Sequence, residues 1–337
     1  MRYLSNNSTD PFWNLAFDEY CLESLPLEEP LFYLWRNRPA VIIGLNQNAY
    51  GEVNLTFLKE HGITLARRVT GGGAVYHDLN NLNYTIVGKT ADLERLDPPY
   101  LHIMENTLRQ IGVDASLSGR NDILVDGRKV SGYAKRVWHD RTMIHGTLLF
   151  DVDLETLARS LDVPGSKMAA GIASVHSKVA NLKDCLEGTG SVLQLRDKLH
   201  AILAGNDSEL ILNQEQLNEI GRLAREKFAK DEWNLGRSPL TGFRCRHKFT
   251  CGTVEAEFCV ERGVITDIRF GGDFIGNKPS DGLERALKGC RYDEASLNER
   301  LAGIGTEEVF EGVKEPELAA MLCNLLSLDL QNSDGTI

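Results

Sequence analysis

The sequence predicts an α+β protein with a large mixed-sheet domain and a smaller second domain. Its 337 residues exceed the usual size of a single domain. Strand patterns between residues 122 and 150 follow one another directly instead of alternating with helices, which favours mixed sheets over strict βαβ units. The segment Asp231–Thr241 (DEWNLGRSPLT) contains Gly and Pro and has no periodicity. We interpret it as the linker and expect domains at residues 1–235 and 242–330.

The first domain is expected to begin with a helix. Thr9-Asp10-Pro11 combines capping side chains with a proline in the first turn, and the helix should run to about Leu25. The apolar runs Leu31–Trp35 and Ala40–Leu45 flank Arg-Asn-Arg-Pro and predict a hairpin. The remaining periodic segments predict helices at 54–61, 99–112, 154–161, 192–204 and 214–230, and strands at 122–125, 128–137 and 142–150.

Beyond the linker, the pattern predicts a hairpin followed by three short helices. Val254–Val260 alternates between apolar and polar residues, and Val264–Phe270 returns after a turn. The second domain is therefore also expected to be a small α+β unit.

Charge and cysteine usage narrow the classes of function. The net charge of -11 argues against nucleic acid or a membrane surface as the main partner. The N-terminus lacks the apolar run of a signal peptide, and no stretch is apolar enough to span a bilayer. Seven cysteines without a C-x-x-C motif indicate reduced thiols in a cytoplasmic protein. Cys245, Cys251, Cys259 and Cys290 do not have the spacing of a zinc site.

The most informative segment is a glycine turn between two strands, RRVTGGGAVYHD. It is neither a dinucleotide fingerprint nor a Walker A loop. Glycines allow positive φ and bring backbone N–H groups close to a ligand, and Arg67 and Arg68 suit an anion. A tight hairpin with a bulge is the alternative. His77 is left with two readings, a direct chemical role or orientation of the turn that begins at Asp78.

A second segment carries a candidate acid and a candidate cation. Asp122 begins a strand and could hold Mg²⁺ beside a phosphate, although an Asx turn is the alternative. Lys129 lies in a local basic patch with the small residues Ser131 and Gly132 close by, which leave room for a ligand. It could neutralise a transferring phosphoryl group, and an exposed strand lysine is the alternative.

These segments resemble the lipoate–protein ligase family. The motifs PFWNLAFDEY, LFYLWRN, RRVTGGGAVYHDLNNLNYT, GRNDI, RKVSG and HGTLLF occur in the family's order over about the first 180 residues. The resemblance implies a catalytic domain of the biotin and lipoate ligase type with a small C-terminal accessory domain. It implies ATP-dependent formation of lipoyl-AMP, then transfer of the lipoyl group to a lysine on the lipoyl domains of 2-oxoacid dehydrogenases and on the glycine cleavage H protein.

The resemblance also assigns residues to roles. Lys129 would be catalytic and would touch both the α-phosphate and the lipoate carboxyl group. The acyl pocket would contain Lys129 together with Trp35, Gly72, His77 and His145. ATP would be bound by Lys129, with Asp122 as the Mg²⁺ ligand, and by Arg68, Gly73, Ala74, Val75, Tyr76 and Asn83.

The implied chemistry is consistent with these residues. A carboxylate that attacks the α-phosphorus of ATP needs compensating positive charge, which Lys129, Arg68, Mg²⁺ and loop N–H groups would supply. An octanoyl or lipoyl transferase of the same fold would need a thiol, yet no cysteine lies between Cys21 and Cys185. A biotin ligase is the second alternative, although the glycine turn resembles the lipoate enzymes. A lipoyl-binding protein without activity is the third.

Overall fold

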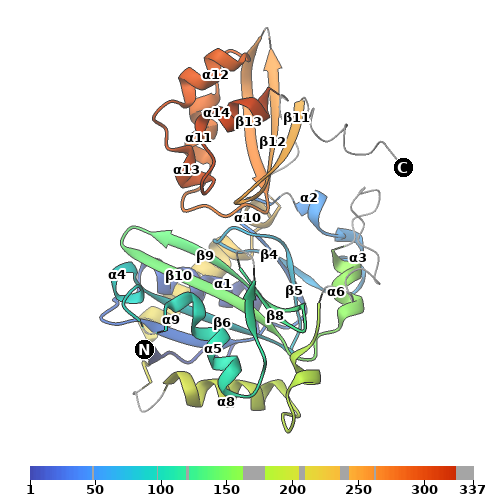
Figure 1. Ribbon diagram of the computed structural model, residues 1–337, viewed down its shortest axis with the longest axis vertical. Coiled ribbons are helices and arrows are strands. Elements are labelled where there is room, and N and C mark those ends of the chain that lie inside the picture. Colours follow the sequence, from blue (N-terminus) through green and yellow to red (C-terminus); the bar gives the residue numbers. More distant parts are fainter. Residues whose placement is uncertain are drawn as a thin grey trace. The chain divides into compact units, whose positions relative to one another are not determined.

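The computed structural model describes residues 1–47, 49–96, 98–118, 121–161, 179–204, 209–235, 243–261 and 263–323 and divides into two compact units (Figure 1). The first unit comprises Met1–Ile43, Ala49–Val69 and Ala74–Gly236. The second comprises Gly44–Asn48, Thr70–Gly73 and Arg237–Ile337. Both combine sheets with helices, so the predicted α+β class is confirmed. Within the described residues, every helix is too short or too polar to cross a membrane.

A seven-stranded mixed sheet forms the centre of the first unit. Its strands run in the order β1-β2-β6-β10-β9-β8-β7, with β1 parallel to β2 and every other pair antiparallel. The long central strands have few exposed side chains, because both faces of the sheet are covered. The strands are β1 (Arg2–Tyr3), β2 (Leu31–Trp35), β6 (Asn81–Lys89), β7 (Ser116–Ser118), β8 (Asp122–Val125), β9 (Arg128–Trp138) and β10 (Arg141–Leu149).

The expected hairpin of the first two apolar runs is wrong. The second run, β3 (Ala40–Ile43), pairs with β4 (Thr64–Arg67) and β5 (Val75–His77) in a separate three-stranded sheet, while β2 pairs with β1 and β6. Both runs are buried along their whole length, so neither has the one-sided alternation that would fix a pairing partner. Strand β5, which follows the glycine turn, pairs with β3 instead, and β6 pairs with β2.

Helices and the small sheet cover the two faces of the large sheet. Helix α1 (Pro11–Glu23) and the small sheet pack on the face that carries Tyr33 and Trp35. Helices α5 (Ile103–Gln110) and α8 (Val192–Ala204) pack on the face that carries Leu34. The remaining helices of this unit are α2 (Ala49–Glu52), α3 (Leu55–Glu60), α4 (Thr90–Leu93), η1 (Tyr100–His102), α6 (Leu154–Ser160), η2 (Leu182–Cys185), α9 (Gln214–Leu223), η3 (Ala224–Phe228) and α10 (Asp231–Asn234).

Helix α1 begins as the sequence predicts. The Asp10 carboxylate accepts hydrogen bonds from the Phe12 and Trp13 backbone N–H groups at 2.9 and 3.4 Å, and Pro11 occupies the first turn. The predicted helix over 214–230 is interrupted, because α9 ends at Leu223 and a π-helical turn, η3, follows.

The start of the expected linker is helical and belongs to the first unit. Asp231–Asn234 forms α10, and its side chains and carbonyls bind the end of β4. The Arg67 guanidinium donates to the carbonyls of Trp233 and Asn234 at 3.0 and 2.8 Å. The Asn234 side chain accepts from Arg67 N–H at 2.8 Å and donates to the Phe228 carbonyl at 2.7 Å. The rest of the expected linker, residues 236–241, lies outside the described residues.

In its described residues, the second unit has a three-stranded antiparallel sheet and four helices. The expected hairpin is confirmed as β12 (Gly252–Glu261) and β13 (Val264–Gly272), and β11 (Phe243–Phe249) adds a strand that the sequence analysis missed. Four helices pack against this sheet where three were expected (Figure 1). They are α11 (Asp281–Leu287), α12 (Glu294–Leu301), α13 (Thr306–Val309) and α14 (Glu315–Leu322).

Asn234→Ala should destabilise the first unit. The substitution leaves the buried Arg67 N–H and the Phe228 carbonyl without their partner, which costs about 1–3 kcal/mol. Urea unfolding of the two proteins measures the difference. Asn218→Ala is the matched control, because Asn218 lies exposed on α9 and bonds only an exposed glutamine there. Equal stabilities for Asn234→Ala and the wild type would contradict the structural role of this contact.

Candidate active site

One face of the large sheet carries two rows of polar side chains. Tyr33, Thr85 and His145 lie opposite one another on β2, β6 and β10. Two residues along, and therefore on the same face, a second row crosses five strands. It consists of Trp35, Asn83, Thr147, Gly132 and Asp122. The predicted residues Trp35, Asn83, Asp122 and His145 are thus brought together on one surface.

A β-bulge places Lys129 on this same face. Ile123 pairs with Ser131 and Leu124 with Lys129, so β9 has one extra residue, Val130, at this point. In a regular strand, Lys129 and Gly132 would point to opposite faces because they are three residues apart. The extra residue reverses the alternation and directs the lysine side chain across Gly132.

The ammonium group of Lys129 lies between Gly132 and Asp122. Its Nζ is 2.7 Å from Asp122 Oδ1, and both side chains are about one-third exposed, each at 36%. A Cβ at Gly132 would lie 2.8 Å from both Cε and Nζ of Lys129. The space at Gly132, which the sequence suggested for a ligand, is therefore filled by the lysine itself. A ligand at this place would meet a partly exposed cation.

A buried carboxylate organises the first polar row. Asp18 of α1 accepts hydrogen bonds from the Tyr33 hydroxyl at 2.6 Å and the Thr85 hydroxyl at 3.0 Å. Its second oxygen accepts from His145 Nδ1 at 2.6 Å. The Thr85 hydroxyl in turn accepts from the Trp35 indole N–H at 3.0 Å. Two residues predicted for the acyl pocket, Trp35 and His145, are thus held in place by one carboxylate.

The two arginines before the glycine turn have different surroundings. Arg67 donates to α10, whereas Arg68 is buried with its guanidinium donating to the Ile42 carbonyl at 3.1 Å. Burial, with the nearby charge of Arg67, lowers the pKa of Arg68 to about 9. An anion beside this group would stabilise its charged form.

The glycine turn itself divides between the two units. Gly72 has φ of 87°, as the sequence predicts for a glycine-dependent turn, and it is grouped with Gly73 in the second unit. Tyr76 of the first unit is buried in the core beside β3, and the partly buried Ala74 packs against the same cluster. Val75 packs against the cluster that contains Trp35. The predicted contacts of these residues with ATP or lipoate remain predictions.

His77 is buried and does not orient Asp78. Its Nδ1 lies 3.0 Å from Asn37 Nδ2, and its ring lies edge-on to Trp35 with the ring centroids 6.1 Å apart. Asp78 instead accepts from the backbone N–H groups of Asn80 and Asp153 at 2.8 and 3.1 Å. The hypothesis that His77 orients the turn at Asp78 is therefore wrong, and the hypothesis of a direct chemical role remains a prediction.

Sequence reasoning missed the residues that support this surface. Asp18, Thr85 and Asn37 are almost completely buried, and none was proposed as functional. A signal did exist in the sequence: Asn14 and Asp18 are four residues apart on a helix whose other buried residues are mostly apolar. Polar side chains on such a face need buried partners.

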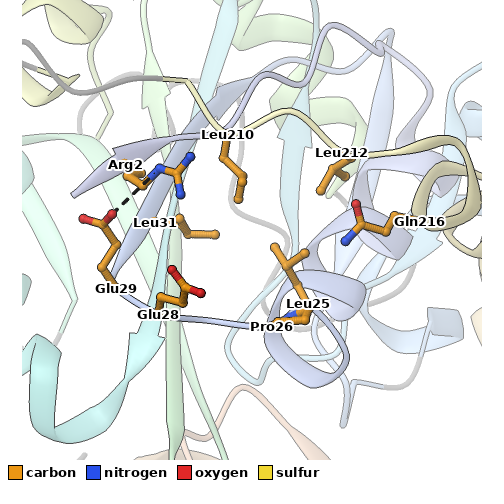
Figure 2. Close-up of a pocket in the computed structure, with 9 residues that line it drawn as sticks. All are labelled: Arg2, Leu25, Pro26, Glu28, Glu29, Leu31, Leu210, Leu212 and Gln216. Atoms are coloured by element: carbon orange, nitrogen blue, oxygen red, sulfur yellow. Dashed lines mark ion pairs between the residues drawn. The ribbon is translucent and has the colours of Figure 1, made fainter.

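A pocket at the far edge of the large sheet has no connection with these residues. Figure 2 shows the residues that line it, which come from β1, β2 and the segment before α9. Its volume is about 220 Å³. Its floor is Leu31 and Leu210, and the Arg2–Glu29 ion pair crosses its rim at 3.8 Å. Its lining contains none of the predicted site residues, so we do not assign the chemistry to it.

The large sheet brings the lysine–aspartate pair and two rows of polar side chains to one face, and Arg68 is buried in the same unit. The chain belongs to the lipoyl protein ligase family. The lipoyl protein ligase A/B catalytic domain matches residues 10–204, and the bacterial lipoate protein ligase C-terminus matches residues 238–322.

Individual relatives agree with this assignment. The chain is 35% identical over 331 residues to lipoate–protein ligase 1 of Staphylococcus aureus, covering 96% of this chain and 100% of the relative. It is similar to the structure of Plasmodium falciparum LipL1 in complex with lipoate, with a TM-score of 0.75, 25% identity and coverage of 98% and 99%. The predicted assignment to the lipoate–protein ligases, which are enzymes of the ligase class, is confirmed.

Two further structures match the larger part of the chain. A bipartite lipoate protein ligase of Thermoplasma acidophilum, described with its lipoyl domain, gives a TM-score of 0.63 at 30% identity and covers 71% of this chain and 97% of its own. A lipoate–protein ligase A bound with ATP gives 0.59 at 29% identity, with coverage of 70% and 98%.

Gly132→Ala should displace the Lys129 ammonium without unfolding the protein. The new methyl group would meet only the flexible end of the lysine and the Asp122 carboxylate. A misplacement of about 1 Å in a catalytic group can cost about 10²-fold in rate, so we expect a large fall in kcat with little change in melting temperature. Gly190→Ala is the control, because its Cβ would make only an ordinary 3.5 Å contact. Full activity in Gly132→Ala would show that the lysine does not need this position.

Acid should destabilise the protein through His77. Burial, with the charges of Arg68 and His145, lowers its pKa from 6.5 to about 3. Between these two pH values the unfolded chain binds a proton at this residue and the folded chain does not, so stability falls as pH falls, by about 1.4 kcal/mol per pH unit at most. Urea unfolding at pH 7, 6 and 5 measures the free energy of unfolding, which should depend less on pH in His77→Gln than in the wild type. If this free energy changes equally with pH in both proteins, the lowered pKa of His77 is contradicted.

Proposed function

We propose that this chain activates lipoate with ATP as lipoyl-AMP and then transfers the lipoyl group to a lysine of a lipoyl domain. The observation that carries the proposal is the Lys129–Asp122 pair, which the bulge places on the same sheet face as Trp35 and His145. A cation and an apolar indole on one surface suit a carboxylic acid with an apolar tail. The ATP-bound and lipoate-bound relatives support the choice of substrates.

The first step joins two anions, and the cations of this face offset their repulsion. A carboxylate oxygen of lipoate attacks the α-phosphorus of ATP, and pyrophosphate leaves with the electron pair of the broken P–O bond. Lys129 would stabilise the charge that builds up on the α-phosphate, and Arg68 would bind the nucleotide. The backbone from Gly73 to Tyr76 and the Asn83 side chain would complete the nucleotide site.

Asp122 can serve as the single protein carboxylate that binds a Mg²⁺ ion. Among the described residues, no three histidine, cysteine, aspartate or glutamate side chains converge to hold a metal on their own. Mg²⁺ is commonly bound through one or two carboxylates, phosphate oxygens and water, to which a single partly exposed aspartate can contribute. The ion would neutralise phosphate charge when it is bound. Asp122 also forms the ion pair with Lys129.

The second step transfers the acyl group to an amine. The lysine nitrogen of the carrier bonds to the acyl carbon, the bond from that carbon to the phosphate oxygen breaks, and AMP leaves as the amine loses a proton. The Thermoplasma ligase described with its lipoyl domain supports carriers of this kind, and we infer lipoyl domains of 2-oxoacid dehydrogenases and the glycine cleavage H protein. Seven free cysteines suit the reducing cytoplasm as the place of action.

A thiol-dependent transferase of the same fold is a weaker candidate. Cys21 is completely buried on α1, and burial raises the pKa of its thiol well above the usual value. Burial also raises the pKa of Cys185. A thiol relay needs a lowered pKa, because the thiolate is the nucleophile.

One assay separates the candidate functions. Pyrophosphate release is measured with ATP and lipoate, octanoate or biotin, in the absence of a carrier. Release with lipoate supports the proposal, release only with biotin supports a biotin ligase, and no release with any acid leaves a transferase or a binding protein. The preference between lipoate and octanoate follows from the same measurement.

Lys129→Ala should lose activity and remain folded. Removing a preorganised group that stabilises transition-state charge typically costs about 10²–10³ in rate. Lys129→Arg should recover little, because a planar guanidinium does not replace a compact ammonium over Gly132. Lipoate-dependent pyrophosphate release and melting temperature are measured for both variants. Near-normal release by Lys129→Ala would refute the assignment and leave Lys129 as an ordinary strand lysine.

A further inference from the structure

Three buried asparagines form a chain of hydrogen bonds that ends at His77. Asn6 Nδ2 donates to Asn14 Oδ1 at 3.0 Å, and Asn14 Nδ2 donates to Asn37 Oδ1 at 2.7 Å. Asn37 Nδ2 lies 3.0 Å from His77 Nδ1. All four side chains are at most 8% exposed. We call Asn6, Asn14 and Asn37 the asparagine relay.

Two backbone carbonyls fix the direction of the relay. The Asn14 amide nitrogen also faces the carbonyl oxygens of Ser8 and Arg36, at 3.2 and 2.9 Å. A carbonyl can only accept a hydrogen bond, so this end of Asn14 must be its NH₂ group. Asn37 then accepts with its oxygen and presents its own NH₂ group to His77.

The relay therefore determines the tautomer of His77. Nδ1 accepts from Asn37, so in the neutral ring the proton is on Nε2. Within the described part of the chain, Nε2 is buried and has no hydrogen-bond partner. A buried donor without an acceptor destabilises the protein, and a bound ligand that accepts from this donor would remove that cost.

The surroundings of His77 indicate what the missing acceptor is. Its ring lies edge-on to Trp35, the indole on the predicted acyl surface. The positive charge of Arg68 acts on His77 strongly enough to help lower its pKa. An acceptor at this place should therefore carry negative charge and continue into an apolar chain. A carboxylic acid with an apolar tail has both properties.

We propose that His77 donates a hydrogen bond from Nε2 to the carboxyl oxygen of the acyl substrate, in the tautomer that the asparagine relay imposes. The inference rests on the proposed function, whose substrate is such an acid. The same oxygen belongs to a carboxylate before activation, to the carbonyl of the mixed anhydride afterwards, and to an oxyanion when the carrier amine attacks. A neutral N–H donor can bind all three forms. His77 is then a catalytic residue, and Asn14 and Asn37 are positioning residues.

Burial keeps this donor neutral under working conditions. With a pKa of about 3, the ring carries no charge at neutral pH. A neutral ring cannot form a salt bridge with the carboxylate, so it would release the oxygen readily when its charge disappears on activation. The role of His77 as a neutral hydrogen-bond donor differs from that of Lys129, which is a partly exposed cation paired with Asp122.

The first test is the tautomer itself, measured by NMR on protein labelled with ¹⁵N-histidine. His77 should carry its proton on Nε2, and in Asn37→Asp it should move to Nδ1, because the carboxylate that replaces the amide can only accept. The His77 Nε2–H signal should shift when lipoate is added. A wild-type proton on Nδ1 would overturn the inference whatever the activity of the variants.

The second test compares rates of lipoate-dependent pyrophosphate release. His77→Phe keeps an aromatic ring without a donor and should lose about 10²–10³ in kcat, as for removal of an oxyanion donor. His77→Gln keeps an amide donor and should be more active than His77→Phe. Asn37→Asp should lose about tenfold or more, since a wrong tautomer presents an acceptor to the substrate oxygen. Asn218→Asp makes the same chemical change on an exposed face of α9 and should have normal activity.

The outcomes separate this inference from the proposed function. No pyrophosphate release by the wild type with lipoate would refute the proposed function. Release by the wild type together with normal kcat in a folded His77→Phe would refute only the role of His77. Transfer from supplied lipoyl-AMP to a lipoyl domain should fall in parallel in His77→Phe, because the same oxygen becomes the oxyanion of the second step. An unchanged transfer rate would also overturn the inference.

Discussion

The pairing register of the central strands is the constraint on which the site depends. Antiparallel pairing of β6, β10 and β9 places Thr85 opposite His145, and Thr147 between Asn83 and Gly132. Because side chains alternate strictly between faces, a shift of one residue would send both polar rows into the apolar layer of α5 and α8. The cost of burying them there without partners keeps the register unique. The bulge at Val130 breaks the alternation of β9, and it is the reason that Lys129 joins the site.

Helix α1 packs on this face and binds its buried polar groups. Asp18 binds Tyr33, Thr85 and His145, and Asn14 connects the loops before and after it to His77. The contacts with His145 and, through Asn37, with His77 restrain two residues predicted for the acyl pocket, so the helix acts as a scaffold whose polar side chains set orientations and tautomers. Such a network is stable only when its members are paired, which makes the unpartnered Nε2 of His77 informative.

The cations of the site have divided roles. Arg67 donates hydrogen bonds to carbonyls of α10 and so connects α10 to the end of β4. The neighbouring Arg68 is buried in the core and has a lowered pKa. Lys129 is the partly exposed cation of the sheet face and is paired with Asp122. A site of this kind offers an incoming anion one buried and one accessible positive charge. That distribution fits a reaction in which one anion must be brought to another.

The sequence by itself determined the class of the fold, the start of α1, most strands of the large sheet and the glycine-dependent turn at Gly72. These depend on local capping, periodicity and glycine backbone freedom, which are properties of short segments. The tertiary structure alone decided which strands pair, as the separation of Leu31–Trp35 from Ala40–Ile43 into two sheets shows. It also decided that Gly132 makes room for Lys129 instead of a ligand, that Arg67 is structural, and that His77 is held by Asn37. These outcomes depend on contacts between residues distant in the chain, and sequence spacing does not encode their geometry.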